Sequence, residues 1–211
     1  MINNSMQDWM QNIEQWAANQ DDCPDFAIFE RKLSHSNLNC LGYSLEAAKH
    51  VQPGEIALRR SMRSVSENEK NELRDSFNAQ LLVRNLMQRT PFEDDIRQSL
   101  TDDGLIAVNG PDELLRKGYY PIALFFTQEP GTTSHLDFHL VRYNSNGIWS
   151  WIPGIGEPIA CRATNYETLE DEKVINPFTV KWPTKQQADS IWLVPKGGYE
   201  TLLLGQSPET M

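Results

Sequence analysis

The order of the elements that the sequence predicts, with helices first and antiparallel strands afterwards, indicates an α+β fold. Two observations carry this prediction. Apolar residues recur at helical spacing through the first half of the chain, whereas residues 119–151 are rich in aromatic and branched side chains and contain a hairpin signal. A doubly wound fold would instead alternate strands with helices. The length of 211 residues suits a single domain.

The N-terminal part, residues 1–33, is predicted to be a helical extension. Its first segment is an amphipathic helix whose apolar stripe consists of Met6, Trp9, Met10, Ile13 and Trp16. Serine and asparagine then cluster before Cys40, which is the composition of a helix N-cap. The sequence therefore predicts a second helix that starts at or near Cys40 and stops before Pro53.

Residues 55–118 are predicted to form a helical insert. Ser66 and Glu69 have the spacing of a capping box, and a helix is expected from there to Arg89. Thr90-Pro91 is expected to end that helix. Two shorter helices are predicted over 92–100 and 111–117.

The sheet is predicted within residues 119–195. Strands are expected over 119–128, 136–143, 148–151 and 191–194, with a tight turn at Asn144-Ser145-Asn146-Gly147. The polar stretch between Ala160 and Asp189 gives no clear pattern. We expect one antiparallel meander.

Composition excludes several classes of function. The formal net charge is −10, with 19 basic and 29 acidic residues, which argues against nucleic acid and against an anionic membrane surface as partners. No apolar run reaches the length of a membrane span. Three cysteines are a poor disulfide framework, and no N-terminal signal peptide is visible. These features predict a cytoplasmic site of synthesis, with export, where it occurs, by a signal-peptide-independent route.

Cys40 and His139 are the pair that points to chemistry. Unpaired N–H groups at a helix N-terminus favour a thiolate and can stabilise an oxyanion beside it. His139 lies mid-strand, and strand alternation puts Asp137, His139 and Val141 on one face. A thiolate and an imidazole held by a strand are what nucleophilic acyl transfer requires.

These two segments resemble a known superfamily. The run Asn39-Cys40-Leu41-Gly42-Tyr43-Ser44-Leu45 looks like the nucleophile helix of papain-like and NlpC/P60-like cysteine hydrolases. The run Asp137-Phe138-His139-Leu140-Val141-Arg142-Tyr143, followed by a Trp-Ser strand and Pro153-Gly154, resembles an uncharacterised bacterial branch of that superfamily. The resemblance implies a papain-like fold, with the Cys40 helix packed on a small antiparallel sheet.

The resemblance also implies roles for further residues. Asn37 or Asn39 would donate an amide N–H to the oxyanion. A third group usually orients the imidazole from the next strand, which here offers Ser150 and Trp151 as cleft residues. Asp137 is then one candidate for the orienting group. The other candidates lie in the polar stretch: Asn165, Asp171 and Asn176.

The resulting hypothesis is a cysteine hydrolase that cleaves an amide through an acyl-enzyme, as a protease, a peptidoglycan amidase or a glutamine deamidase. Its partner would be a protein or peptide substrate. A secreted bacterial effector or toxin fits the superfamily, and such a protein would have a cognate inhibitor protein or chaperone. No cofactor is predicted, and no metal, because the cysteines are scattered and no zinc motif is present.

Two other interpretations stay open. Cys40 could be an ordinary buried thiol and His139 a structural histidine, since free cysteines are among the most buried residues. The chain would then be a catalytically inactive papain-like fold that binds a protein through its N-terminal helix or the 66–89 helix. A plain adaptor domain, with the two residues unrelated in space, is the third hypothesis. Because the 55–118 insert separates Cys40 from His139 in the sequence, we expect it to border the cleft.

Overall fold

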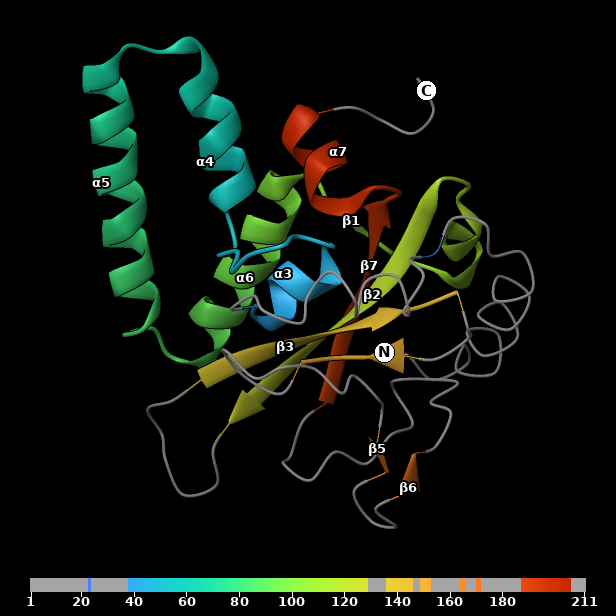
Figure 1. Cartoon of the computed structure of the whole chain (residues 1–211). Helices are drawn as coiled ribbons and strands as arrows, with labels where there is room; N and C mark the ends of the chain where they lie inside the picture. The colour runs from blue at the N-terminus through green and yellow to red at the C-terminus, as the bar shows by residue number, and fades with distance from the viewer. Residues whose placement is uncertain are drawn as a thin grey trace.

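A five-stranded antiparallel sheet is the centre of the computed structural model (Figure 1). The structure describes residue 23 and residues 38–128, 136–145, 149–152, 164–165, 170–171 and 187–205. The strand order is β1-β7-β2-β3-β4. Its members are β1 (Ile106–Ala107), β7 (Gln187–Pro195), β2 (Tyr119–Gln128), β3 (Leu136–Tyr143) and β4 (Trp149–Ser150). A separate pair is formed by β5 (Thr164–Asn165) and β6 (Glu170–Asp171). The predicted α+β class is confirmed.

The described helices come mainly before the sheet, as predicted. They are α3 (Cys40–Ser44), α4 (Glu55–Ser61), α5 (Glu67–Arg84), α6 (Arg89–Asp103) and α7 (Gly198–Leu204), with 3₁₀ turns η1 (Met62–Ser64) and η2 (Pro111–Leu115). The capping box at the start of α5 is present, because Ser66 and Glu69 bond reciprocally. The predicted N-terminal helix lies outside the described residues.

Two predicted helix boundaries are wrong. The helix at Cys40 ends after five residues because Glu46 adopts a left-handed conformation, with φ of 55°, that breaks it. In the other case the helix expected to reach Arg89 ends at Arg84, and Pro91 does not end a helix. It lies in the first turn of α6, where a missing N–H costs nothing because that turn has no intrahelical acceptor for it.

The sheet contains more than the sequence pattern predicted. β2 and β3 have the predicted bounds, whereas the late strand 191–194 is the inner part of the longer β7, which pairs with both β1 and β2. β1 belongs to the segment 55–118, so that insert is not purely helical and contributes a strand to the sheet. Backbone pairing explains this, because an edge strand of two residues needs no apolar pattern of its own.

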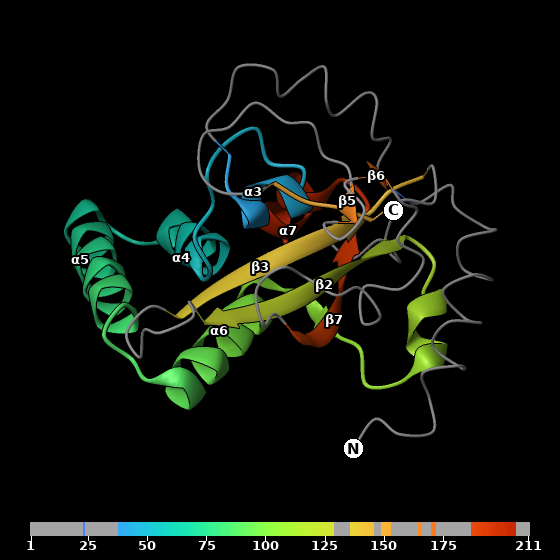
Figure 2. The same cartoon turned by 90° about the horizontal axis from the view of Figure 1, so that it is seen from below.

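One face of the sheet carries the helices. Phe126 of β2 packs edge-on against Phe92 of α6, and Tyr120 donates its hydroxyl to the Ser44 carbonyl of α3. Both side chains belong to the same strand face by alternation. In contrast, α5 projects from the body, and its only buried residue is Arg84 (Figures 1 and 2).

A carboxylate from α6 caps the start of α4. Asp103 is fully buried and accepts hydrogen bonds from the N–H groups of Gly54 at 2.7 Å and Ala57 at 2.9 Å. Burial raises the pKa of Asp103 to about 6, and these N–H bonds and the Arg60 charge offset that rise only in part. The Asp103 carboxyl therefore keeps its proton to a higher pH in the folded protein than in the unfolded chain.

The free energy of unfolding is expected to fall as the pH rises from 4 to 7. The unfolded carboxyl of Asp103 ionises near the ordinary aspartate pKa of 3.8 and the folded one only near 6, so its contribution is present below pH 4 and lost above pH 6. Urea unfolding measures the free energy of unfolding of wild type and of Asp103→Asn. Between pH 4 and pH 7, wild type should lose about 2 kcal/mol relative to the variant. A difference that is constant with pH would contradict this.

Candidate functional site

The start of α3 is built by the side chain of Asn39. Its Oδ1 accepts hydrogen bonds from Gly42 N at 2.9 Å and Val51 N at 3.1 Å, while its Nδ2 donates to Val51 O at 2.7 Å. Asn39 therefore caps the helix and fastens it to the loop that returns along it. The sequence analysis expected the Asn39 amide to donate to an oxyanion. In the structure the same amide bonds to the backbone of Gly42 and Val51.

A buried polar network joins α3 to β3 and β4. Arg142 donates to the Tyr43 carbonyl at 3.1 Å and to the Tyr43 hydroxyl at 3.3 Å, and its guanidinium lies over the Tyr43 ring. The Tyr43 hydroxyl bonds to Ser150, which also accepts from Asn144 Nδ2 at 2.6 Å. Ser150 is thus a buried structural residue, and the network holds Cys40 in position relative to the sheet.

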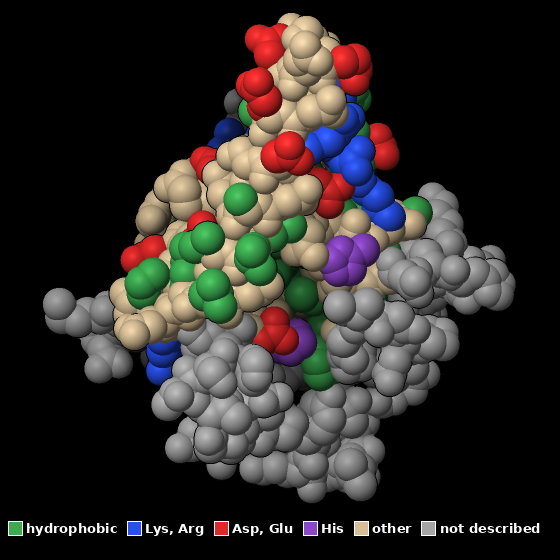
Figure 3. Space-filling view, turned by 90° about the vertical axis from the view of Figure 1, so that its left-hand side faces the viewer, with side chains coloured by type: hydrophobic (Ala, Val, Ile, Leu, Met, Phe, Trp, Pro, Cys, Tyr) green, Lys and Arg blue, Asp and Glu red, His purple; other side chains and the backbone are tan. Residues whose placement is uncertain are grey.

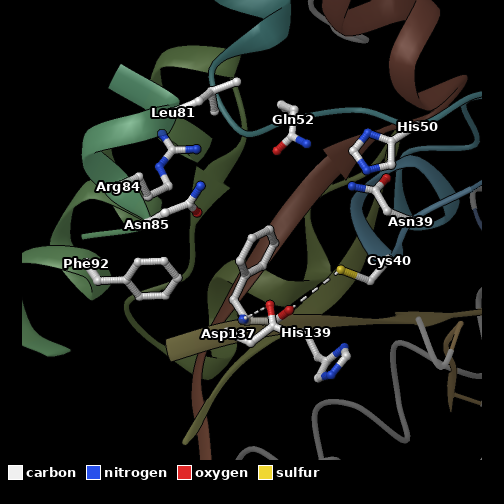
Figure 4. A pocket seen from close by; sticks show the side chains of 11 residues that line it. Asn39, Cys40, His50, Gln52, Leu81, Arg84, Asn85, Phe92, Asp137 and His139 are labelled. Carbon is white, nitrogen blue, oxygen red and sulfur yellow. Dashed lines mark hydrogen bonds between the residues drawn. The ribbon is translucent and has the colours of Figure 1, made fainter. Parts of the chain in front are cut away.

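A pocket of about 410 Å³ opens at the N-terminal end of α3. Its walls come from α3 and the loop after it, from the end of α5, from α6 and from β3. The lining residues are Asn39, Cys40, His50, Gln52, Leu81, Arg84, Asn85, Phe92, Asp137, Phe138 and His139 (Figure 4). The described end of α5 therefore borders the cleft, as the sequence analysis expected of the 55–118 insert.

The Cys40 thiol lies against the backbone of β3. Its Sγ donates to the Phe138 carbonyl oxygen at 3.8 Å (Figure 4). Burial raises the pKa of Cys40 to about 12, and the Asp137 charge adds to the rise. The N–H groups of Leu140 and of the helix start lower it only in part. The thiol is therefore protonated at neutral pH.

His139 points to the other face of β3. Since Arg142 reaches α3, the even-numbered residues of β3 face that helix, and the odd-numbered ones face away. The His139 ring packs edge-on against Trp151, with centroids 5.7 Å apart. Figure 4 shows the imidazole and the Cys40 sulfur on opposite sides of the β3 ribbon. Both residues nevertheless line the same pocket, and no hydrogen bond joins the imidazole to the Cys40 thiol among the described residues.

The His139 imidazole is partly buried, and its hydrogen bonds are incomplete in the part of the chain that the structure describes. Burial lowers its pKa, an effect that the Asp137 carboxylate partly opposes. Its Nδ1 is buried without a hydrogen-bond partner in the described part of the chain. Asp137 is exposed and accepts from the N–H of Phe138 at 2.8 Å. Its carboxylate therefore bonds to the backbone of β3 and does not orient the imidazole through a hydrogen bond.

The remaining predicted site residues do not line the pocket in the part of the chain that the structure describes. Trp151 lies beside His139. Asn165 and Asp171 belong to β5 and β6. Asn37 and Asn176 lie outside the described residues.

Sequence reasoning missed the pocket's other polar residues. His50, Gln52, Arg84 and Asn85 come from a loop and a helix end that are far apart in sequence. The only available signal was the break after Ala47, where helix-forming residues give way to His50-Val51-Gln52-Pro53. That pattern predicts a loop and says nothing of what the loop faces.

Comparisons with family models, with curated proteins and with solved structures find no match for this chain. Within the described ranges, no group of three or more histidine, cysteine or acidic residues is arranged to hold a metal ion. The same ranges contain no helix that is long and apolar enough to span a membrane.

Proposed function

We propose that this chain is a protein-binding module with a papain-like layout, in which the pocket at Cys40 receives a polypeptide and performs no catalysis. The observation that carries the proposal is that the Cys40 thiol bonds to Phe138 O while the His139 ring packs on Trp151, so that no described hydrogen bond links the two residues. A strand residue cannot change faces without a shift in register, which would move every side chain of β3.

The contacts of Cys40 support a structural role for the thiol. The sulfur donates to Phe138 O at the edge of β3, where β4 pairs only with Arg142 and Tyr143 among the described residues. The thiol thus satisfies a backbone acceptor of β3 at a position to which β4 does not extend. A nucleophile would need the thiolate, which burial disfavours here.

A cysteine hydrolase is the second candidate, because Cys40 begins a helix and opens into a pocket that also contains His50. In that case the thiol proton passes to an imidazole and then to the leaving amine, while Sγ forms the acyl-enzyme that water hydrolyses. His139 was the base expected from sequence, and His50 is a second imidazole that lines the pocket. A peptide or side-chain amide would be the substrate, and export as an effector belongs to this second candidate.

The alkylation of Cys40 by iodoacetamide separates the two candidates. In a chain with Cys23→Ser and Cys161→Ser, we expect alkylation at pH 7.5 to be roughly 100-fold slower than that of a free thiol, since a pKa of about 12 leaves little thiolate. The rate should rise with pH up to about 10 without a plateau, and His139→Ala and His50→Ala should leave it unchanged. Fast alkylation near pH 6, lost in either histidine variant, would establish the hydrolase instead.

A further inference from the structure

The end of α5 carries an exposed apolar surface next to the pocket. Leu82, Val83 and Leu86 are 66 %, 51 % and 78 % exposed, which are high values for large apolar side chains. They lie one helical turn or less from Leu81 and Asn85, which line the pocket. We call Leu82, Val83 and Leu86 the apolar rim. The rim and this part of the pocket wall therefore lie at the same end of α5 and in the residues just after it.

The carboxylate in the pocket lining belongs to Asp137. Asp137 is exposed at the pocket and has no ion-pair partner among the described residues. The guanidinium in the pocket belongs to Arg84, which is already paired with Asp95. Figure 3 shows apolar side chains gathered on one side of a hollow whose margin carries acidic and histidine side chains, with Lys or Arg side chains above one histidine. The chain as a whole has a net charge of −10. A cationic ligand group is the complement of this arrangement.

The edge of β3 is not available for strand addition at this point. Phe138 O already accepts from the Cys40 thiol, and the N–H of Leu140 also faces that sulfur. A peptide beside the pocket cannot make the ladder that gives strand-addition partners their affinity. A peptide bound here must therefore be recognised through its side chains, by apolar contacts and by charge.

We propose that the apolar rim and the pocket together dock a protein segment that carries aliphatic side chains next to a lysine or arginine. The aliphatic side chains cover Leu82 and Leu86, and the cation faces Asp137. This inference rests on the proposed function, because it names the partner of the same pocket.

The test is selection of a phage-displayed library of random heptapeptides on the full chain. We expect the selected peptides to be enriched in Lys or Arg beside Leu, Ile or Phe. Their affinity, measured with the synthetic labelled peptides by fluorescence anisotropy, should fall roughly threefold on Asp137→Asn. It should fall roughly tenfold on the double variant Leu82→Ser/Leu86→Ser, because binding then buries less apolar surface.

Matched controls lie on α7, away from the pocket lining. Leu204→Ser removes an apolar side chain that is 54 % exposed, and Glu200→Gln removes an exposed carboxylate. Both should bind the selected peptides as wild type does. Because all these positions are exposed, the substitutions should leave the midpoint of urea unfolding close to that of wild type.

Three outcomes overturn the inference. In the first, the selected peptides are not enriched in basic and aliphatic residues. In the second, their affinity does not fall on the rim and Asp137 variants. In the third, it falls equally on the α7 controls. Selected peptides of another composition that still lose affinity on Gln52→Ala would overturn the inference and leave the proposed pocket function standing. Fast, histidine-dependent alkylation of Cys40 would overturn the non-catalytic function and leave the docking surface standing.

Discussion

Gly42→Ala is expected to destabilise the protein by about 3 kcal/mol or more. An added Cβ at this position would lie 2.2 Å from the Lys49 carbonyl oxygen and 3.1 Å from Asn39 Oδ1. The first contact is with backbone, so no side-chain rotation relieves it. The loop of residues 47–51 would have to leave α3, and with it the cap bonds between Asn39 and Val51. Urea unfolding followed by tryptophan fluorescence measures the loss.

Gly110→Ala is the matched control. No atom lies within 4 Å of a Cβ built on Gly110, and its φ of −160° is extended backbone that alanine adopts freely. Its free energy of unfolding should stay within about 0.5 kcal/mol of wild type. If the two variants had equal stability, the close approach of the 47–51 loop to α3 would be refuted.

The sheet was largely predictable because its strands carry their own patterns. β2 combines aromatic and branched residues, and β3 alternates, so both bounds follow from sequence. β7 was cut short because the segment 187–190 is mostly polar, although it pairs with β2 all the same. Pairing by backbone atoms leaves no trace in composition.

The candidate site was predicted only in part, for a reason of geometry. The sequence placed Cys40 at a helix start and His139 on a strand, and both placements hold. Alternation also predicted that Asp137, His139 and Val141 share a face. It cannot tell which face meets α3. That choice depends on Arg142 reaching Tyr43, a contact between residues 99 positions apart.

Arg84→Ala is expected to release α5 from the body of the protein. Arg84 is the only buried residue of that helix, and it joins three segments by pairing with Asp95, donating to Ser99 Oγ at 2.9 Å and donating to Pro53 O at 3.3 Å. In proteins most of the stability of a helix comes from its packing on the rest of the fold. Amide exchange over residues 67–84 should therefore become at least about tenfold faster, which hydrogen–deuterium exchange mass spectrometry measures.

The same substitution also tests whether the pocket depends on α5. Arg84→Ala should lower the global free energy of unfolding by about 2 kcal/mol, because Asp95 and Ser99 lose their partner. Arg74→Ala removes an exposed arginine whose one hydrogen bond among the described residues is to Asn71 on the same helix. It should change neither the amide exchange over residues 67–84 nor the free energy of unfolding. If exchange over 67–84 stayed as slow as in wild type, the partly buried apolar side chains of α5 would be sufficient to hold it. The wall that Leu81 and Asn85 give the pocket would then not depend on the Arg84 bonds.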